Sequence, residues 1–174
     1  MANLAAGLTQ APPYRLGVLA LSTAAAVIAG ALAFEHIGGY APCPLCLQQR
    51  YAYYGGVPAL FLALVLVTTG QSRAAGLLFL AVCLAFLGNA VLAGYHSGVE
   101  WGLWLGPDTC AAGTPQPLGS GSGGILDKLS TTRVIRCDEA AWRFLGLSLA
   151  GWNVLASLFV AAVSLSAALK AWRT

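Results

Sequence analysis

Residues 51 to 94 read YAYYGGVPALFLALVLVTTGQSRAAGLLFLAVCLAFLGNAVLAG, and this segment decides the fold. It contains two uncharged runs, Tyr51 to Thr69 and Ala74 to Gly94, on either side of the turn from Gly70 to Arg73. At a rise of about 1.5 Å per residue, a helix formed by either run is long enough to cross a hydrocarbon layer of about 30 Å. Because the connection is short, we expect two antiparallel membrane helices that pack as neighbours.

Two further uncharged runs, Leu16 to Phe34 and Phe144 to Leu169, have the same character. The first also resembles a secretory signal peptide, because it follows Arg15 and ends near an Ala-Leu-Ala triplet. It is longer than the roughly 7 to 15 apolar residues of such a peptide, which favours a retained span. We therefore predict an all-α membrane protein, a four-helix transmembrane bundle in a single domain. Its expected spans are at about residues 16–34, 44–69, 74–94 and 144–169 of the 1–174 chain.

The composition excludes several other classes of protein. Of the 174 residues, 58% are hydrophobic and only 9% are charged, whereas a soluble domain carries about 25% charged residues. An ordinary soluble domain and a disordered chain are both incompatible with this balance. The net charge of +3 is small and scattered, so the chain offers no basic surface for nucleic acid.

Basic residues orient the predicted bundle. Arg15, Arg73, Lys170 and Arg173 fall on the side of the membrane that holds both termini. The positive-inside rule makes that side cytoplasmic. The long loop on the opposite side also carries basic residues, but acidic residues offset them there and long loops count less in this rule.

Two outer loops are expected on the opposite side, at about residues 37–46 and 95–143. Within the longer loop, residues 113–124 read GTPQPLGSGSGG. This segment has too little apolar content to hold one structure and predicts a flexible tether.

Four of the five cysteines lie in these outer loops. Cys43 and Cys46 form a Cys-Pro-Leu-Cys motif in the shorter loop, and Cys110 and Cys137 lie on either side of the tether in the longer one. An oxidising exterior permits disulfides at all four positions. Cys83 falls in the middle of a span, where we expect it to pack as a small apolar side chain.

The Cys-x-x-Cys motif indicates redox chemistry. Such pairs are readily reduced, and they tend to hold a cysteine with a lowered pKa, whose thiolate is the attacking species. Pro44 suits the first position of a helix, which makes Cys43 the N-cap and places Cys46 in the first turn, where free backbone N–H groups favour a thiolate. Arg50 lies one turn deeper, where it can steady a thiolate or donate to an oxygen acceptor, although an arginine at a membrane boundary can also be a simple interfacial anchor.

Polar residues in or beside the spans have more than one interpretation. His96 and Glu100 have the i, i+4 spacing of a proton-handling pair, or they form only the polar rim of the third span. Asn89 and Asn153 are expected to form hydrogen bonds between helices.

A metal site is a minority interpretation. Structural zinc sites use two closely spaced pairs of ligands, but Cys110 and Cys137 are separated by 26 residues. Covalent haem of the c type is excluded because Leu47, not histidine, follows the motif. We therefore predict no metal.

Three segments resemble the disulfide bond formation protein B (DsbB) family of bacterial inner membranes. They are PCPLCLQQR at residues 42–50, YHSGVE at 95–100 and CDEAAWRFLGLS at 137–148. The resemblance extends in order and topology from Arg15 to about Leu169.

The resemblance implies a quinone-dependent thiol oxidase that reoxidises a periplasmic, DsbA-like thioredoxin-fold partner. It implies that the reduced partner attacks Cys110, that Cys137 completes this outer disulfide, and that Cys137 exchanges with Cys43. It further implies that Cys46 lies nearest the quinone, which is ubiquinone or menaquinone, with Arg50 beside the head group and His96 on the facing helix end. Both termini would be cytoplasmic and both redox loops periplasmic.

Two alternatives remain open at this point. One is a non-catalytic membrane protein that binds metal through its outer cysteines. The other is a quinone reductase of the vitamin K epoxide reductase-like group, which shares four helices and a Cys-x-x-Cys motif. In that group the motif commonly follows a later span, whereas here it precedes the second.

Overall fold

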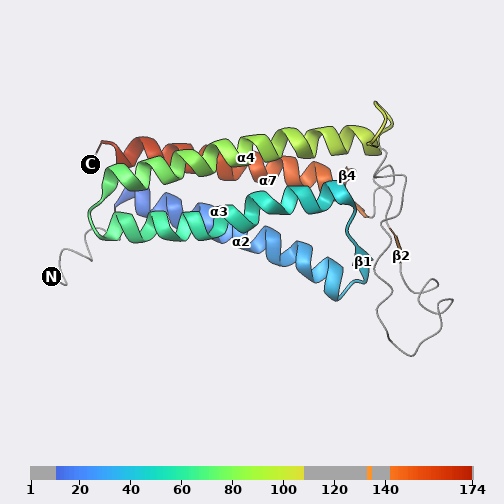
Figure 1. The fold of residues 1–174 in the computed structure, drawn as a ribbon, viewed down its shortest axis with the longest axis horizontal. Coiled ribbons are helices and arrows are strands. Elements are labelled where there is room, and N and C mark those ends of the chain that lie inside the picture. Colours follow the sequence, from blue (N-terminus) through green and yellow to red (C-terminus); the bar gives the residue numbers. More distant parts are fainter. Residues whose placement is uncertain (1–10, 108–132, 135–141, 174) are drawn as a thin grey trace.

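The computed structural model describes residues 11–107, 133–134 and 142–173. Its four long helices run alternately up and down, so that the start of the first and the end of the last lie at the same end of the bundle (Figure 1). All four are long and apolar enough to cross a membrane, which confirms the predicted all-α membrane fold. They are α2 (Pro12–His36), α3 (Pro44–Thr68), α4 (Ser72–Glu100) and α7 (Leu149–Ala171).

The helix boundaries follow from local sequence. α3 begins at Pro44 with Cys43 as its N-cap, as the motif predicts, because proline fits the first helical position and has no N–H to satisfy. α7 begins after Ser148, whose hydroxyl accepts a hydrogen bond from the Gly151 N–H at 3.1 Å. Gly70, at φ +78°, ends α3 and allows the tight turn into α4.

The last helix begins at Leu149 and not at Phe144, where the uncharged run begins. The preceding residues form a hairpin in which β3 (Arg143–Phe144) pairs antiparallel with β4 (Leu147–Ser148). Its two turn residues, Leu145 and Gly146, have φ of 52° and 82°. Such positive values are incompatible with a right-handed helix, so α7 cannot begin before this turn. The apolar composition of this segment hides the turn. At the other outer boundary, α4 continues to Glu100, so residues expected at the start of the long loop are helical.

Small residues bring the helices close together in the core. Gly56 on α3 faces the ring of Phe86 on α4, and a Cβ added at Gly56 would lie only 2.5 Å from a ring carbon. Close approach through small residues is typical of helix packing in membranes, where apolar burial between helices gains little. Among the described residues, seven alanines are completely buried in this way: Ala20, Ala24, Ala63, Ala75, Ala93, Ala167 and Ala168.

The outside of the bundle is apolar. Large side chains such as Phe61, Leu77 and Val91 are more than half exposed along the helices. Lipid can cover such a surface, whereas water cannot solvate it favourably. Asn89 and Asn153 instead point inward and form interhelical hydrogen bonds, as expected. Cys83 is buried in the core, also as expected.

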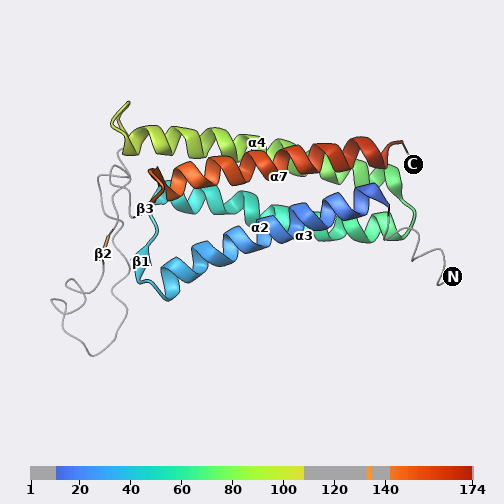
Figure 2. The same ribbon diagram turned by 180° about the vertical axis from the view of Figure 1, so that it is seen from behind.

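The two ends of the bundle differ. Arg15, Arg73 and Lys170 lie in the end turns of α2, α4 and α7 at one end. At the other end α2 diverges from its neighbours (Figures 1 and 2). There β1 (Tyr40–Ala41) pairs in parallel with β2 (Arg133–Val134). Cys110, Cys137 and the tether at 113–124 lie outside the described residues.

Candidate functional site

A cavity of about 390 Å³ lies at the end of the bundle where α2 diverges. Side chains of α2, α3 and α7 line it, together with His96 and Glu100 from the last turns of α4. Most of the lining is apolar, and the volume is within the range of small-molecule sites. The other polar side chains that line it are Glu35, Tyr40, Cys43, Cys46, Gln49, Arg50, Tyr53 and Asn153.

The inner cysteine pair occupies the first turn of α3. The Cys43 and Cys46 sulfur atoms lie 2.6 Å apart, and the backbone N–H of Cys46 donates to the Cys43 sulfur at 3.2 Å. Cys43 is only 2% exposed. Both cysteines line the cavity, so an oxidant bound there would be beside the pair.

Hydrogen bonds to the Cys43 sulfur favour its thiolate form over its thiol form. A bond from the Cys46 thiol lowers the pKa of Cys43 from 9.0 to about 5, against the opposing effect of burial. His96 and the backbone N–H of Cys46 act in the same direction as the Cys46 thiol. Three donors on one sulfur stabilise its negative charge because each bond is stronger to the thiolate than to the thiol.

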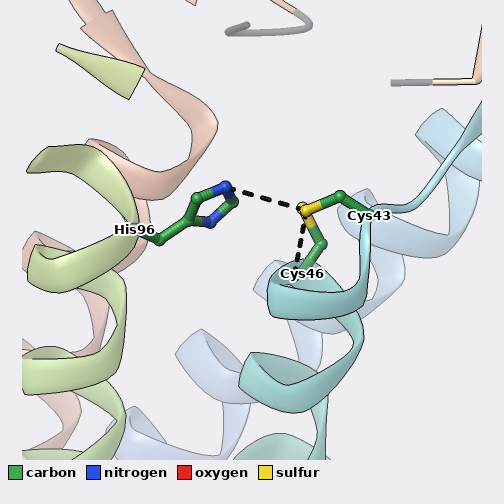
Figure 3. A group of neighbouring side chains, drawn as sticks. All are labelled: Cys43, Cys46 and His96. Carbon is green, nitrogen blue, oxygen red and sulfur yellow. Dashed lines mark hydrogen bonds between the residues drawn. The ribbon is translucent and has the colours of Figure 1, made fainter. Parts of the chain in front are cut away.

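His96 reaches the cysteine pair from the facing helix. Figure 3 shows its ring on α4 directed at the sulfurs at the start of α3, with Nε2 3.7 Å from the Cys43 sulfur. Nε2 is also 4.0 Å from one carboxylate oxygen of Glu100, and the other oxygen of that carboxylate accepts a hydrogen bond from the Ser148 hydroxyl. The side chains of His96 and Glu100 are 4% and 5% exposed. Both side chains face inward at the end of α4, beside the cysteine pair.

Arg50 forms an ion pair with Glu35 of α2 and also donates to the carbonyl oxygen of Ala31 at 3.4 Å. The side chain of Arg50 is 12% exposed and that of Glu35 is 30% exposed. Glu35 was missed in the sequence, where it directly follows the first uncharged run. Glu35 and Arg50 lie at the same predicted membrane boundary, and this shared position is the signal that could have predicted their ion pair.

A chain of amide groups continues inward from His96. The Gln49 side chain is 2.9 Å from His96 Nδ1, and Asn153 of α7 donates to the Gln49 oxygen at 2.5 Å. The Tyr53 hydroxyl donates to the Asn153 oxygen at 2.5 Å. Gln49 and Tyr53 were not expected in the site, because their partners belong to helices distant in sequence.

The ligand atoms of Cys43, Cys46 and His96 all lie within 4.8 Å of one another, a spacing that a soft metal ion could use. A metal on Nε2 would require Nδ1 to carry the proton and donate it to an acceptor. Gln49 presents its NH₂ group, a donor, to Nδ1. The arrangement therefore does not fit a metal bound through His96 Nε2.

Of the six residues predicted to be redox-active or quinone-binding, four line one cavity: Cys43, Cys46, Arg50 and His96. The other two, Cys110 and Cys137, belong to the part of the chain that is not described. The described residues therefore assemble a dithiol beside an apolar cavity whose wall also holds the Arg50–Glu35 ion pair.

Comparison with known proteins gives one consistent result. Residues 14–167 match the family model of disulfide bond formation protein DsbB. A "Disulfide bond formation protein B" from Methylococcus capsulatus is 34% identical over 146 residues, which cover 81% of this chain and 85% of the relative. A "Disulfide bond formation protein B 2" from Pseudomonas entomophila is 35% identical over 156 residues, 84% of this chain and 85% of the relative. A further relative, from a Polaromonas species, is 29% identical over 89% of this chain and 90% of its own length. No solved structure gives a significant match.

Proposed function

The chain belongs to the DsbB family of membrane disulfide oxidoreductases, and from this premise we propose that it transfers electrons from a periplasmic thioredoxin-fold dithiol protein, through two cysteine pairs, to a membrane quinone. The protein would lie in the bacterial inner membrane with both termini cytoplasmic. The basic residues at one end of the bundle and the cysteine pair at the other support this orientation.

The first exchange would pass electrons to the outer pair. A thiolate of the reduced partner attacks Cys110 of the Cys110–Cys137 disulfide, and Cys137 leaves as a thiolate. The second thiolate of the partner then displaces Cys110. The partner gains a disulfide, and the outer pair gains two electrons. The Gly/Ser/Pro-rich tether between these cysteines supports the proposal, because each mixed disulfide requires approach and withdrawal.

The second exchange would pass the same electrons inward. Cys137 attacks Cys43 of the inner disulfide, and Cys46 leaves as a thiolate. Cys110 then attacks Cys137 and displaces Cys43. The outer disulfide is restored, and the inner pair holds the two electrons.

The position of the Cys43–Cys46 pair in the wall of the apolar cavity is the observation that carries the proposal. A thiol with a low pKa is a good leaving group in disulfide exchange. With a pKa of about 5, Cys43 is displaced as an already stable thiolate, which favours the reduced inner pair and the oxidised outer pair. Electrons are thereby drawn toward the cavity.

The cavity has the character of a quinone site. Its apolar walls suit a hydrophobic ring and tail, while Arg50 can donate hydrogen bonds to a carbonyl oxygen. Arg50, His96 and Cys46 would hold the head group, whose two carbonyl oxygens are common to ubiquinone and menaquinone. When bound, a quinone supplies an acceptor for two electrons and two protons.

Quinone reduction by the purified full-length protein tests this function. We expect turnover with a reduced periplasmic thioredoxin-fold dithiol protein and a soluble quinone. Turnover is measured as the loss of quinone absorbance. Serine at Cys43 or Cys46 should abolish turnover, while serine at Cys83 is the matched control and should preserve it. Turnover that survives either substitution in the inner pair would overturn the proposal.

A further inference from the structure

We propose that Gln49 and Asn153 are positioning residues that hold His96 in the tautomer with its proton on Nε2, directed at the Cys43 sulfur. This inference deepens the proposed function, since it concerns the same inner cysteine pair. It rests on the direction in which hydrogen bonds run through three helices.

The direction is set first at the imidazole. The nitrogen of the Gln49 side chain lies 2.9 Å from His96 Nδ1. An amide NH₂ group can only donate, so Nδ1 must accept and cannot carry a proton. In a neutral imidazole the proton is then on Nε2. That nitrogen is 3.7 Å from the Cys43 sulfur.

Asn153 determines which end of the Gln49 amide faces the imidazole. Its NH₂ group donates to the Gln49 oxygen at 2.5 Å. If the Gln49 amide were reversed, two NH₂ groups would face each other at this contact. Gln49 is 5% exposed, so the reversed arrangement would lose a hydrogen bond between two buried amides and set two donors against each other.

Two hydroxyl groups hold Asn153 in turn. Its oxygen accepts from Tyr53 at 2.5 Å and from Ser157 at 3.4 Å. Ser157 is free to donate because it accepts from the NH₂ group of Asn89 at 2.9 Å. In each hydrogen bond along this path, the residue nearer Asn89 is therefore the donor and the residue nearer the Cys43 sulfur is the acceptor. The last donor in the chain is His96 Nε2–H, which favours a thiolate over a thiol at Cys43.

The tautomer can be measured directly. The chain has two histidines, and in a His36→Gln background the ¹⁵N signals of a histidine-labelled sample in detergent belong to His96 alone. His36 lies at the exposed end of α2 and is no part of the cavity. We expect a protonated Nε2 and an unprotonated Nδ1 at neutral pH. A proton on Nδ1 with a bare Nε2 would overturn the inference.

Two substitutions test the positioning residues. Gln49→Glu replaces the donor facing Nδ1 by an acceptor of the same shape, so Nδ1 should become the protonated nitrogen. Asn153→Leu removes the donor that orients Gln49, so the single tautomer should be lost and a mixture should appear. Asn89→Leu is the matched control, because Tyr53 still holds Asn153 there, and the wild-type signals should persist.

An Asn153→Leu sample that keeps the wild-type signals would remove Asn153 from the proposal, and a Gln49→Glu sample that keeps a bare Nδ1 would remove Gln49. If Asn153→Leu fails to fold, the wild-type and Gln49→Glu spectra still decide the tautomer. The measurement needs neither quinone nor partner. Failure of the tautomer would therefore leave quinone reduction intact, and failure of quinone reduction would leave the spectra unchanged.

Discussion

Replacing Cys46 by alanine should raise the pKa of Cys43 from about 5 toward its ordinary value of 9.0. The hydrogen bond from the Cys46 thiol is the largest cause of the low value, and alanine removes it. The backbone N–H of residue 46 remains, and so does His96. We therefore expect a substantial but incomplete return.

The size of the effect follows from the thiolate population. At pH 6, a thiol with a pKa of 5 is roughly 90% thiolate, whereas one with a pKa of 9 is roughly 0.1% thiolate. A complete return would slow thiolate alkylation about 1000-fold at this pH. Because the largest cause of the low pKa is lost while two donors remain, we expect slowing of between about tenfold and 1000-fold. Tenfold slowing at pH 6 corresponds to a rise in the pKa of about two units, or roughly 2.7 kcal/mol of thiolate stabilisation.

The assay is alkylation of the reduced protein by iodoacetamide between pH 4 and pH 9, with Cys43 quantified by tandem mass spectrometry. In the unmodified chain the rate should rise through a midpoint near pH 5. Cys83→Ala, a change at a buried thiol outside the cavity, should leave that midpoint unchanged. A midpoint near 9 in the unmodified chain, or the same midpoint after Cys46→Ala, would mean that the Cys46 thiol does not stabilise the Cys43 thiolate.

Three further predictions concern stability and can be measured by thermal unfolding in detergent. Gly56→Ala should destabilise the bundle by about 1–3 kcal/mol because the new methyl group would press on a phenylalanine ring of α4. A Cβ at Gly55 has no neighbour within 4 Å, so Gly55→Ala should be neutral or slightly stabilising. Equal effects of the two substitutions would contradict this packing. Ser148→Ala removes the N-cap of α7 and should cost about 1 kcal/mol, whereas an unchanged midpoint would mean that the cap contributes nothing. Glu35→Gln leaves Arg50 without its counter-charge and should cost about 1–3 kcal/mol. Arg50→Gln should restore part of this loss, whereas strictly additive losses would show that the two residues do not interact.

The architecture could be predicted because membrane spans obey simple rules. Every backbone N–H and C=O group must be satisfied within the hydrocarbon layer, so long apolar runs become helices. The proline of the Cys-x-x-Cys motif fixed the start of α3 at Pro44 and made Cys43 its N-cap. The start of α7 was harder to predict from the sequence, because the hairpin before it is as apolar as a membrane helix. That hairpin depends on positive φ values at Leu145 and Gly146.

The site could be predicted only where its residues are neighbours in sequence. Cys43, Cys46 and Arg50 share one helix face, and their spacing indicates their chemistry. Gln49 and Asn153 contact each other across 104 residues, and no periodicity in a single chain reveals such a pair. The ion pair of Glu35 with Arg50 likewise depends on how α2 lies against α3.

If electrons pass from the partner to the quinone, one partner disulfide is formed for each quinone reduced, and this ratio can be measured without oxygen. The purified full-length protein is mixed with a reduced periplasmic thioredoxin-fold dithiol protein and a known amount of quinone, without oxygen. The partner disulfide and the quinol are then both quantified. We predict equal amounts of the two products, because each disulfide releases two electrons and each quinone accepts two. Partner oxidation without an equal amount of quinol, or no dependence on quinone, would contradict the account.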